Sequence, residues 1–293
     1  MTSTSLHVLH VFAVPGTTGP SGNPTTIALH ADALSSEDMR GIAARFGHES
    51  GFVSAPPAGS AFDFTFRFFV PNHEMEMCGH ATLGALWIVR ELGLWPASRA
   101  SVAISTKSGP VTGQLIEGEL GGRIAISQPK GRVVTLPDPD AHTARVASVL
   151  GITPGDLAGP IRNAATSRVK TLVPLKSEDA VHALRPDFAR MEALCEDIGS
   201  TGLYPYAAVD LQKRIFEARQ FPKAVGYPED AATGIAASAL AFGLLENGLV
   251  TANEQPICVR QGRAMGQPSQ IEVTFDGTNG CWLTGHVRRE VKE

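Results

Sequence analysis

The stretch PNHEMEMCGHATLGA at residues 71–85 gathers two histidines, two glutamates and a cysteine just ahead of a helix-like run. Such residues can bind a metal, provide a reactive thiol, or mark a helix start that binds an anion. The zinc-protease pattern HExxH fails, because the residue four after His73 is a methionine. Cys78 and His80 have the wrong separation for one helical ligand face and lack an evident third ligand. We therefore predict no metal at this stretch.

Two interpretations of the residues around Gly79 stay open on local sequence. A helix N-terminus stabilises a thiolate, so Cys78 is either a nucleophile or a spectator thiol lining a pocket. His80 is either functional or a helix-start histidine bonded to the backbone. Glu49 lies between a predicted helix and a predicted strand in RFGHESGFV, where a glutamate is ordinarily a solvated surface residue.

A second helix start resembles the first. GHATLGALWIVRELGL begins at Gly79 and GIAASALAFGLLENGL begins at Gly234, an offset of 155 residues, and both end in glycine followed by leucine. The repeat predicts a duplicated lobe. Two helix starts facing one cleft would bind a carboxylate through free N–H groups and the helix dipoles. Asp230, four residues before Gly234, is either an acidic helix cap or a carboxylate at the mouth of this anion pocket.

The predicted elements show what must position these residues. Strands alternate with helices in both halves of the chain, so we predict an α+β fold of two pseudo-symmetric lobes. The predicted N-terminal lobe is 1–129 and the predicted C-terminal lobe is 130–279. The predicted helices are 36–46, the helix from Gly79, 141–150, 186–197 and 234–246. The predicted strands are 6–14, 52–56, 61–70, 102–129, 169–175, 201–211, 213–221, 256–260, 270–275 and 281–288. A proline-rich crossing is predicted at 130–140.

Composition excludes several classes of function. The 293 residues carry a net charge of −4 with no basic block, which argues against nucleic-acid and membrane-surface partners. No apolar run is long enough for a transmembrane helix, and we find no signal peptide. The four cysteines are scattered without metal spacing, as in a cytoplasmic protein with reduced thiols.

Four motifs together resemble a known family. GNPT (22–25), HESGFV (48–53), MCGHATLG (77–84) and GYPEDAATG (226–234), in this order, are similar to the PhzF-like family of phenazine biosynthesis, in the diaminopimelate-epimerase superfold. The resemblance implies curled, mostly antiparallel or mixed barrel-like sheets, each around a central helix, with the active cleft between the lobes. It also implies that the final strand, 280–293, joins the first lobe. Members are cofactor-independent isomerases, and the resemblance implies a homodimer with a small anionic substrate.

The resemblance also assigns roles to residues. Glu49 corresponds to the acid/base that takes a proton from one carbon and returns it to another, while His80 and Asp230 help to orient and protonate the substrate. Such catalysis contributes about 10²–10⁴-fold to a rate. The helix starts, with their neighbours, are expected to bind the substrate. These binding residues are Cys78, Gly79, Thr233, Gly234 and Ile235.

The chain departs from the family pattern EDPATGS, since it reads EDAATGI. Ala231 replaces a proline and loosens the turn. Ile235 replaces a serine whose hydroxyl would face the substrate, which argues against the phenazine intermediate itself as the substrate and leaves the isomerase class.

Two alternatives remain open. The first is an epimerase, racemase or dehydratase of the same superfold that uses Cys78. A two-thiol racemase is disfavoured, because the 155-residue offset places Thr233, a poor base, opposite Cys78. The second alternative is a metabolite-binding protein that has kept the fold and lost the catalytic activity. The replacement of the family's serine by Ile235 supports this alternative.

Overall fold

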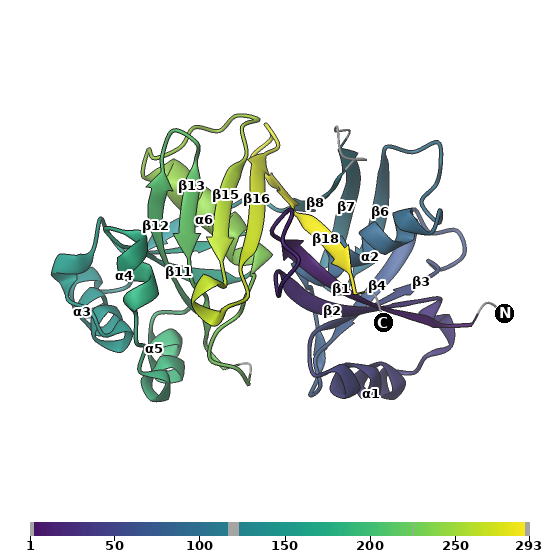
Figure 1. Cartoon of the computed structure of the whole chain (residues 1–293), viewed down its shortest axis with the longest axis horizontal. Coiled ribbons are helices and arrows are strands. Elements are labelled where there is room, and N and C mark those ends of the chain that lie inside the picture. The colour runs from purple at the N-terminus through teal and green to yellow at the C-terminus, as the bar shows by residue number, and fades with distance from the viewer. Residues whose placement is uncertain (1–2, 117–122, 225, 291–293) are drawn as a thin grey trace. The chain divides into compact units, whose positions relative to one another are not determined.

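The computed structural model describes residues 3–116, 123–224 and 226–290. Two compact units make up the chain (Figure 1). Unit 1 is Met1–Ser127 with Thr284–Glu293, and unit 2 is Gln128–Leu283. Residues 291–293 of the predicted final strand lie outside the described part. The predicted α+β class, with a curled mixed sheet around a helix in each unit, is confirmed.

Unit 1 is a mixed sheet curled around helix α2 (Gly79–Glu91). Parallel pairs alternate with antiparallel ones: β2 runs parallel to β3, and β4 runs parallel to β6. Helix α1 (Ser36–Phe46) covers β3 and β4 from the other side. The strands are β1 (Ser5–Ala13), β2 (Asn23–Leu29), β3 (Ser50–Ser54), β4 (Phe64–Phe69), β5 (Glu74–Met75), β6 (Ser101–Thr106), β7 (Gly109–Ile116), β8 (Arg123–Gln128) and β18 (His286–Arg289).

Unit 2 repeats this arrangement around helix α6 (Gly234–Glu246). Its parallel pairs are β11 with β12 and β13 with β15, in the places of β2–β3 and β4–β6. Helices α3 (Pro139–Leu150), α4 (Glu178–Ala183) and α5 (Met191–Asp197) form an outer layer (Figure 1). The strands are β9 (Arg132–Thr135), β10 (Arg162–Ala165), β11 (Val169–Pro174), β12 (Gly202–Asp210), β13 (Ile215–Ala218), β14 (Phe221–Pro222), β15 (Ile257–Gln261), β16 (Ser269–Phe275) and β17 (Cys281–Thr284).

The two central helices are buried around most of their circumference because strands surround them. Both span thirteen residues, and small side chains let the strands approach. At Gly243 in α6, a Cβ atom would lie 2.2 Å from Leu172 Cδ1 on β11. Both helices end as the repeat predicts: Gly93 and Gly248 have positive φ angles, of 70° and 68°. The N–H of the following leucine bonds to a carbonyl five residues back in each case, as in a Schellman cap.

Several predicted elements need correction. The proline-rich crossing at 130–140 contains strand β9, because its residues pair with β10. The predicted helix at 186–197 is a 3₁₀ turn (Phe188–Arg190) followed by α5. The predicted strand at 281–288 is interrupted at Gly285. Strands β2, β5 and β10 and helix α4 have no counterpart in the sequence-based prediction.

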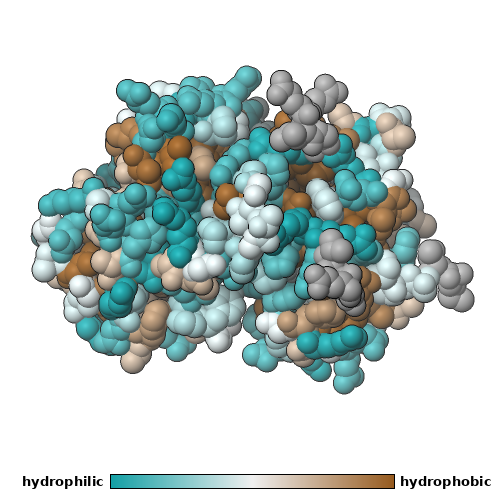
Figure 2. All heavy atoms as spheres, in the orientation of Figure 1, coloured by the Kyte–Doolittle hydropathy of each residue, from teal (hydrophilic) through white to brown (hydrophobic). Residues whose placement is uncertain are grey.

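The surface is mixed in character. The face drawn in Figure 2 carries hydrophilic side chains over much of both units, with hydrophobic side chains in separate areas. Among the described residues, no helix combines the length and the apolar content needed to cross a bilayer.

Candidate active site

Glu49 is held at the point where the chain enters β3. The Thr25 hydroxyl on neighbouring β2 donates a hydrogen bond of 2.8 Å to the Glu49 carbonyl, and Thr25 is fully buried. The Glu49 side chain is only 12% exposed. Glu49 Oε2 lies 4.0 Å from His80 Nε2. The structure therefore places Glu49 in a sheltered position beside the start of α2, where local sequence alone suggested a solvated residue.

His80 occupies the first turn of α2 with its side chain 7% exposed. Its Nδ1 atom lies 3.4 Å from the Sγ atom of Cys78, the N-cap residue of the helix. The imidazole is thus flanked by a thiol on one side and the Glu49 carboxylate on the other. The Thr82 hydroxyl donates a 2.8 Å hydrogen bond to the Cys78 carbonyl and fixes the backbone at this turn. These groups can pass a proton among themselves once a substrate completes the contacts.

His48 is a neighbour that sequence reasoning missed. Its Nε2 atom lies 2.9 Å from the Thr26 hydroxyl. Burial lowers the pKa of His48, and the nearby His80 and His10 lower it further, while Glu49 raises it. His48 is therefore neutral near pH 7. The adjacent letters His-Glu in the HESGFV motif were the available signal.

Asp230 belongs to a buried polar network in unit 2. Its carboxylate accepts a hydrogen bond from the hydroxyl of Thr233, the N-cap residue of α6. The Gln261 side-chain amide donates to the Asp230 carbonyl at 2.7 Å and to the Thr233 hydroxyl at 3.2 Å. The hydroxyl of Tyr204, a fully buried residue, donates to Gln261 Oε1 at 2.9 Å. The contacts that fix Asp230 thus come from three separate segments of unit 2.

Two further groups set the charge of this network. Burial raises the pKa of Tyr204 well above its ordinary value, so that the phenol remains a donor. Lys170 on β11 is 5% exposed. Burial lowers the pKa of its ammonium to about 8, although the Asp230 charge opposes this effect. Sequence reasoning missed Lys170, because a lysine within a strand gives no sign of which face it occupies.

The two helix starts share a feature suited to anions. Gly79 and Gly234 are the first residues of α2 and α6, and each follows an N-cap residue whose side chain makes no capping hydrogen bond. Neither first turn contains an acidic residue, whereas α1 and α3 each carry at least one there. The backbone N–H groups in the first turn of each helix and the helix dipole therefore favour an anionic group at that position. Ile235 lies in the first turn of α6 and is half-buried.

The structure assembles each half of the predicted site within its own unit. Glu49, Cys78 and His80 come together in unit 1, and Asp230 and Thr233 come together at the start of α6 in unit 2. Cys78 and Thr233 occupy the same N-cap position in their helices, as the 155-residue offset predicts. That the two halves serve one cleft stays a prediction.

Comparisons with known proteins show what the chain as a whole is similar to. A family model described as phenazine biosynthesis-like protein (PhzC-PhzF) matches residues 14–288. The isomerase YddE of Escherichia coli O157:H7 is 30% identical over 86% of this chain and 84% of its own. Trans-2,3-dihydro-3-hydroxyanthranilate isomerase of Pseudomonas fluorescens is 30% identical over 87% and 86%. The crystal structure of a PhzF-family phenazine biosynthesis protein of Bacillus anthracis superposes with a TM-score of 0.83 at 25% identity, covering 99% of this chain and 98% of that one.

Proposed function

Because the chain belongs to the PhzC-PhzF family of phenazine biosynthesis-like proteins, we propose that it moves a proton within a small carboxylate-bearing metabolite without a cofactor. Its relatives include named isomerases, and the chain is an enzyme of that class. The observation that carries the proposal is the sheltered Glu49 carboxylate, 4.0 Å from His80 at the start of a buried helix. A carboxylate in such a position is suited to general acid/base catalysis.

The proposed reaction is a net transfer of one proton. Ionised Glu49 removes a proton from a carbon that the substrate's unsaturated system acidifies, and the resulting carboxylic acid returns the proton to a second carbon. His80 donates a hydrogen bond to the intermediate as negative charge develops on it. Asp230, fixed by the hydrogen bond from Thr233, orients the substrate. No electron is gained or lost overall, so the step needs no oxidant or reductant.

The anionic character of the substrate follows from the charge at the helix starts. Neither α2 nor α6 has an acidic residue in its first turn, and buried Lys170 adds a positive charge near Asp230 below pH 8. A carboxylate bound at these helix starts would gain about 0.3–2 kcal/mol from each dipole. This supports a small carboxylate over a neutral or cationic substrate.

Isotope exchange tests the proposal. Candidate carboxylates are incubated with the enzyme in D₂O, and loss of the C–H signal is followed by proton NMR. We expect Glu49→Gln to lower the exchange rate about 10²–10⁴-fold and Cys78→Ser to retain most of it. Exchange that persists in Glu49→Gln and disappears in Cys78→Ser would refute the assignment of Glu49.

One observation favours a second candidate. Cys78 Sγ lies 3.4 Å from His80 Nδ1, an arrangement in which the imidazole can accept the thiol proton. This geometry supports an epimerase or dehydratase that uses Cys78 as its base. The same exchange experiment separates the two candidates, because the thiol mechanism predicts the opposite pattern in the two variants. Tight binding without exchange would instead indicate the metabolite-binding protein.

Ile235 bears on which metabolite is used. The hydroxyanthranilate intermediate that gives the Pseudomonas fluorescens relative its name is the first compound to assay. We expect wild-type turnover of it to be poor and Ile235→Ser to increase it. The homodimer and the cytoplasmic location stay predictions, and sedimentation equilibrium of the purified chain tests the first.

A further inference from the structure

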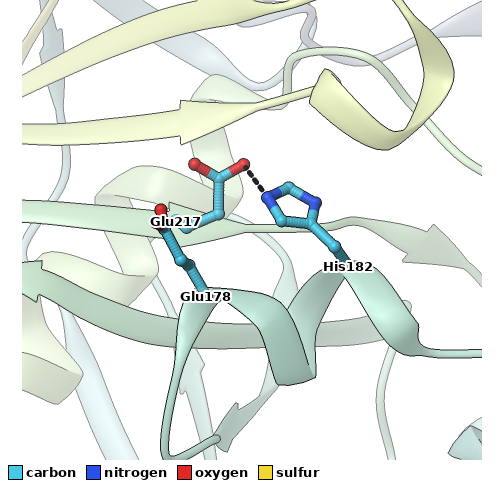
Figure 3. A group of neighbouring side chains, drawn as sticks. All are labelled: Glu178, His182 and Glu217. Carbon is cyan, nitrogen blue, oxygen red and sulfur yellow. Dashed lines mark ion pairs between the residues drawn. The ribbon is translucent and has the colours of Figure 1, made fainter.

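We propose that unit 2 contains a site for a divalent transition metal of the zinc class, formed by Glu178, His182 and Glu217. One ligand atom from each residue lies within 4.8 Å of the other two. Figure 3 shows the two glutamates and the histidine converging from helix α4 and strand β13. The proposal concerns a structural site and is independent of the isomerase mechanism.

The position of the ligands follows from the local fold. Glu178 and His182 are four residues apart on α4, so they share one face of the helix. Val181, on another face, is fully buried in the outer-layer core and fixes the rotation of the helix. Glu217 lies on β13, which pairs with β12 on one side and β15 on the other. Its backbone is therefore held on both sides, and its side chain is completely buried.

The buried polar atoms provide the observation that points to a ligand. Glu217 Oε1 and His182 Nε2 are both buried, and neither forms a hydrogen bond with described residues. The two atoms face each other at 3.3 Å, the ion-pair contact drawn in Figure 3. Ligand atoms 2.0–2.1 Å from a tetrahedral zinc ion are separated from each other by roughly 3.3 Å. The carboxylate oxygen and the imidazole nitrogen are thus spaced as two ligands of one cation would be.

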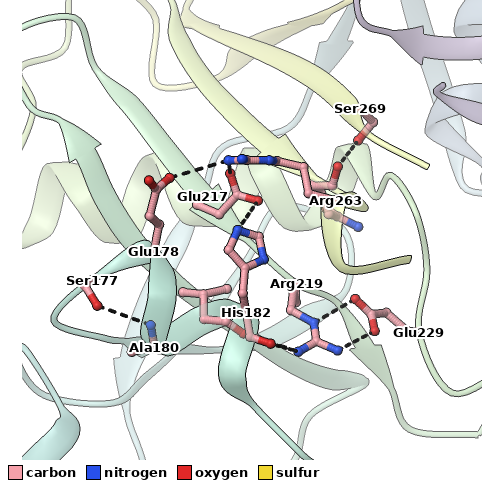
Figure 4. Close-up of polar contacts among 11 residues, drawn as sticks. Ser177, Glu178, Ala180, His182, Glu217, Arg219, Glu229, Arg263 and Ser269 are labelled. Atoms are coloured by element: carbon pink, nitrogen blue, oxygen red, sulfur yellow. Dashed lines mark hydrogen bonds and ion pairs between the residues drawn. The ribbon is translucent and has the colours of Figure 1, made fainter. Parts of the chain in front are cut away.

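The surrounding charges leave these atoms accessible to a cation. Arg263 contacts Glu217 through the other carboxylate oxygen, Oε2, at 3.3 Å, and contacts Glu178 Oε2 at 3.5 Å. Figure 4 shows Arg263 lying across both carboxylates, with His182 approaching Glu217 separately. Glu178 is 41% exposed and provides the route from solvent.

A separate set of contacts positions His182. Arg219 forms a bidentate ion pair with Glu229, at 2.9 and 2.7 Å. The same guanidinium donates to the carbonyls at the end of α4, those of Val181, His182 and Leu184, at 3.2–3.4 Å (Figure 4). These bonds tie the end of α4 to the residue that follows β13. The imidazole is therefore held beside Glu217 before any ion binds.

Calorimetric titration of the chelator-treated full chain with Zn²⁺ tests the proposal. We expect one ion per chain for wild type and at least about 100-fold weaker binding for His182→Gln and for Glu178→Gln. His73→Gln, which removes an exposed histidine in unit 1, is the matched control and should bind as wild type does. Co²⁺ should give the strong visible bands of a four- or five-coordinate ion in wild type and lose them in His182→Gln.

Two further variants separate the proposal from its alternatives. Arg263→Gln removes a competing positive charge and should tighten Zn²⁺ binding, whereas a purely structural ion-pair cluster would gain no affinity. Cys78→Ser should retain full binding. Undetectable binding by wild type, or binding that is lost in Cys78→Ser and kept in His182→Gln, would overturn the proposal. Thermal unfolding of each variant without metal shows whether it is folded.

Discussion

Lys170 makes the stability of the protein depend on pH in a defined window. The residue is 5% exposed, and burial lowers the pKa of its ammonium from 10.5 to about 8 in the folded protein. In the unfolded chain the ammonium regains its ordinary pKa of about 10.4. Between these values the unfolded state binds more protons than the folded state, so the free energy of unfolding rises with pH. Below about pH 8 both states carry the charge, and the folded state bears the full cost of burying it.

The size of this effect follows from the shift. One pH unit corresponds to about 1.4 kcal/mol, so the fall of the Lys170 pKa to about 8 corresponds to about 3 kcal/mol. Lys170→Met has a side chain of similar length that cannot ionise. We expect the stability of wild type relative to Lys170→Met to rise by about 3 kcal/mol from pH 7.5 to pH 10.5 and to be constant below pH 7.5.

Urea unfolding of the two proteins, followed by circular dichroism at half-unit pH intervals, measures this difference. Taking the difference removes the contributions of other groups that titrate in the same range. Asp230→Asn provides a second check, because the Asp230 charge raises the pKa of Lys170. Its loss should extend the rise to lower pH. A difference between wild type and Lys170→Met that is independent of pH would refute the assignment of Lys170 as a buried ammonium.

Two further predictions concern packing and the Asp230 network. Gly243→Ala should lower the free energy of unfolding, measured with urea, by about 1–3 kcal/mol, because the new methyl group would overlap Leu172. Gly41→Ala is the control: it lies on α1 with no atom near the new Cβ and should raise the free energy of unfolding by up to about 1 kcal/mol. Equal effects of the two substitutions would contradict this packing argument. Tyr204→Phe should lower the free energy of unfolding by about 1–2 kcal/mol, since it removes the hydrogen-bond donor to the buried side-chain carbonyl of Gln261. It should also slow isotope exchange. An unchanged free energy of unfolding would show that this hydrogen bond does not contribute to stability.

The helices that begin at Gly79 and Gly234 could be predicted because several local signals coincide there. Glycine at the start, small residues in the first turns and a glycine-leucine end all depend on a few adjacent residues. The structure confirms them in the two thirteen-residue helices. Their duplication in sequence also indicated the duplicated topology, in which the parallel pairs β2–β3 and β11–β12 correspond.

Elements fixed by distant pairing were missed. Strand β2 begins with Asn-Pro, which locally favours a turn, yet its residues pair with β1 and β3. Strand β9 lies within the proline-rich segment 130–140, ahead of its two prolines, and is ordered by pairing with β10. Helix α4 is only six residues long, and the core on one face stabilises it. Such contacts between distant residues leave little trace in a single sequence.

The same limit applies to the candidate site. Glu49 was identified through the family resemblance, because residues distant in sequence, on β2 and at the start of α2, hold it in its sheltered position. Its neighbours in the sequence do not indicate that position. Lys170 and Glu217 lie on strands whose inward and outward faces could not be assigned from sequence. The spacing of Glu178 and His182 was visible as Glu-x-x-x-His but has no meaning until α4 is known to be a helix.

Strand β18 pairs along β1, with Leu9 opposite Arg289 and Val11 opposite Val287. These two strands are separated by some 275 residues of the chain, so the sheet of the first unit cannot be completed until the residues of β18 have been translated. The second unit is one uninterrupted segment, Gln128–Leu283, so all of its residues have been translated before β18 is made. Order of synthesis and order of completion are therefore reversed, and a nascent chain stalled before residue 284 would lack the strand that pairs with Leu9–Ala13 of β1.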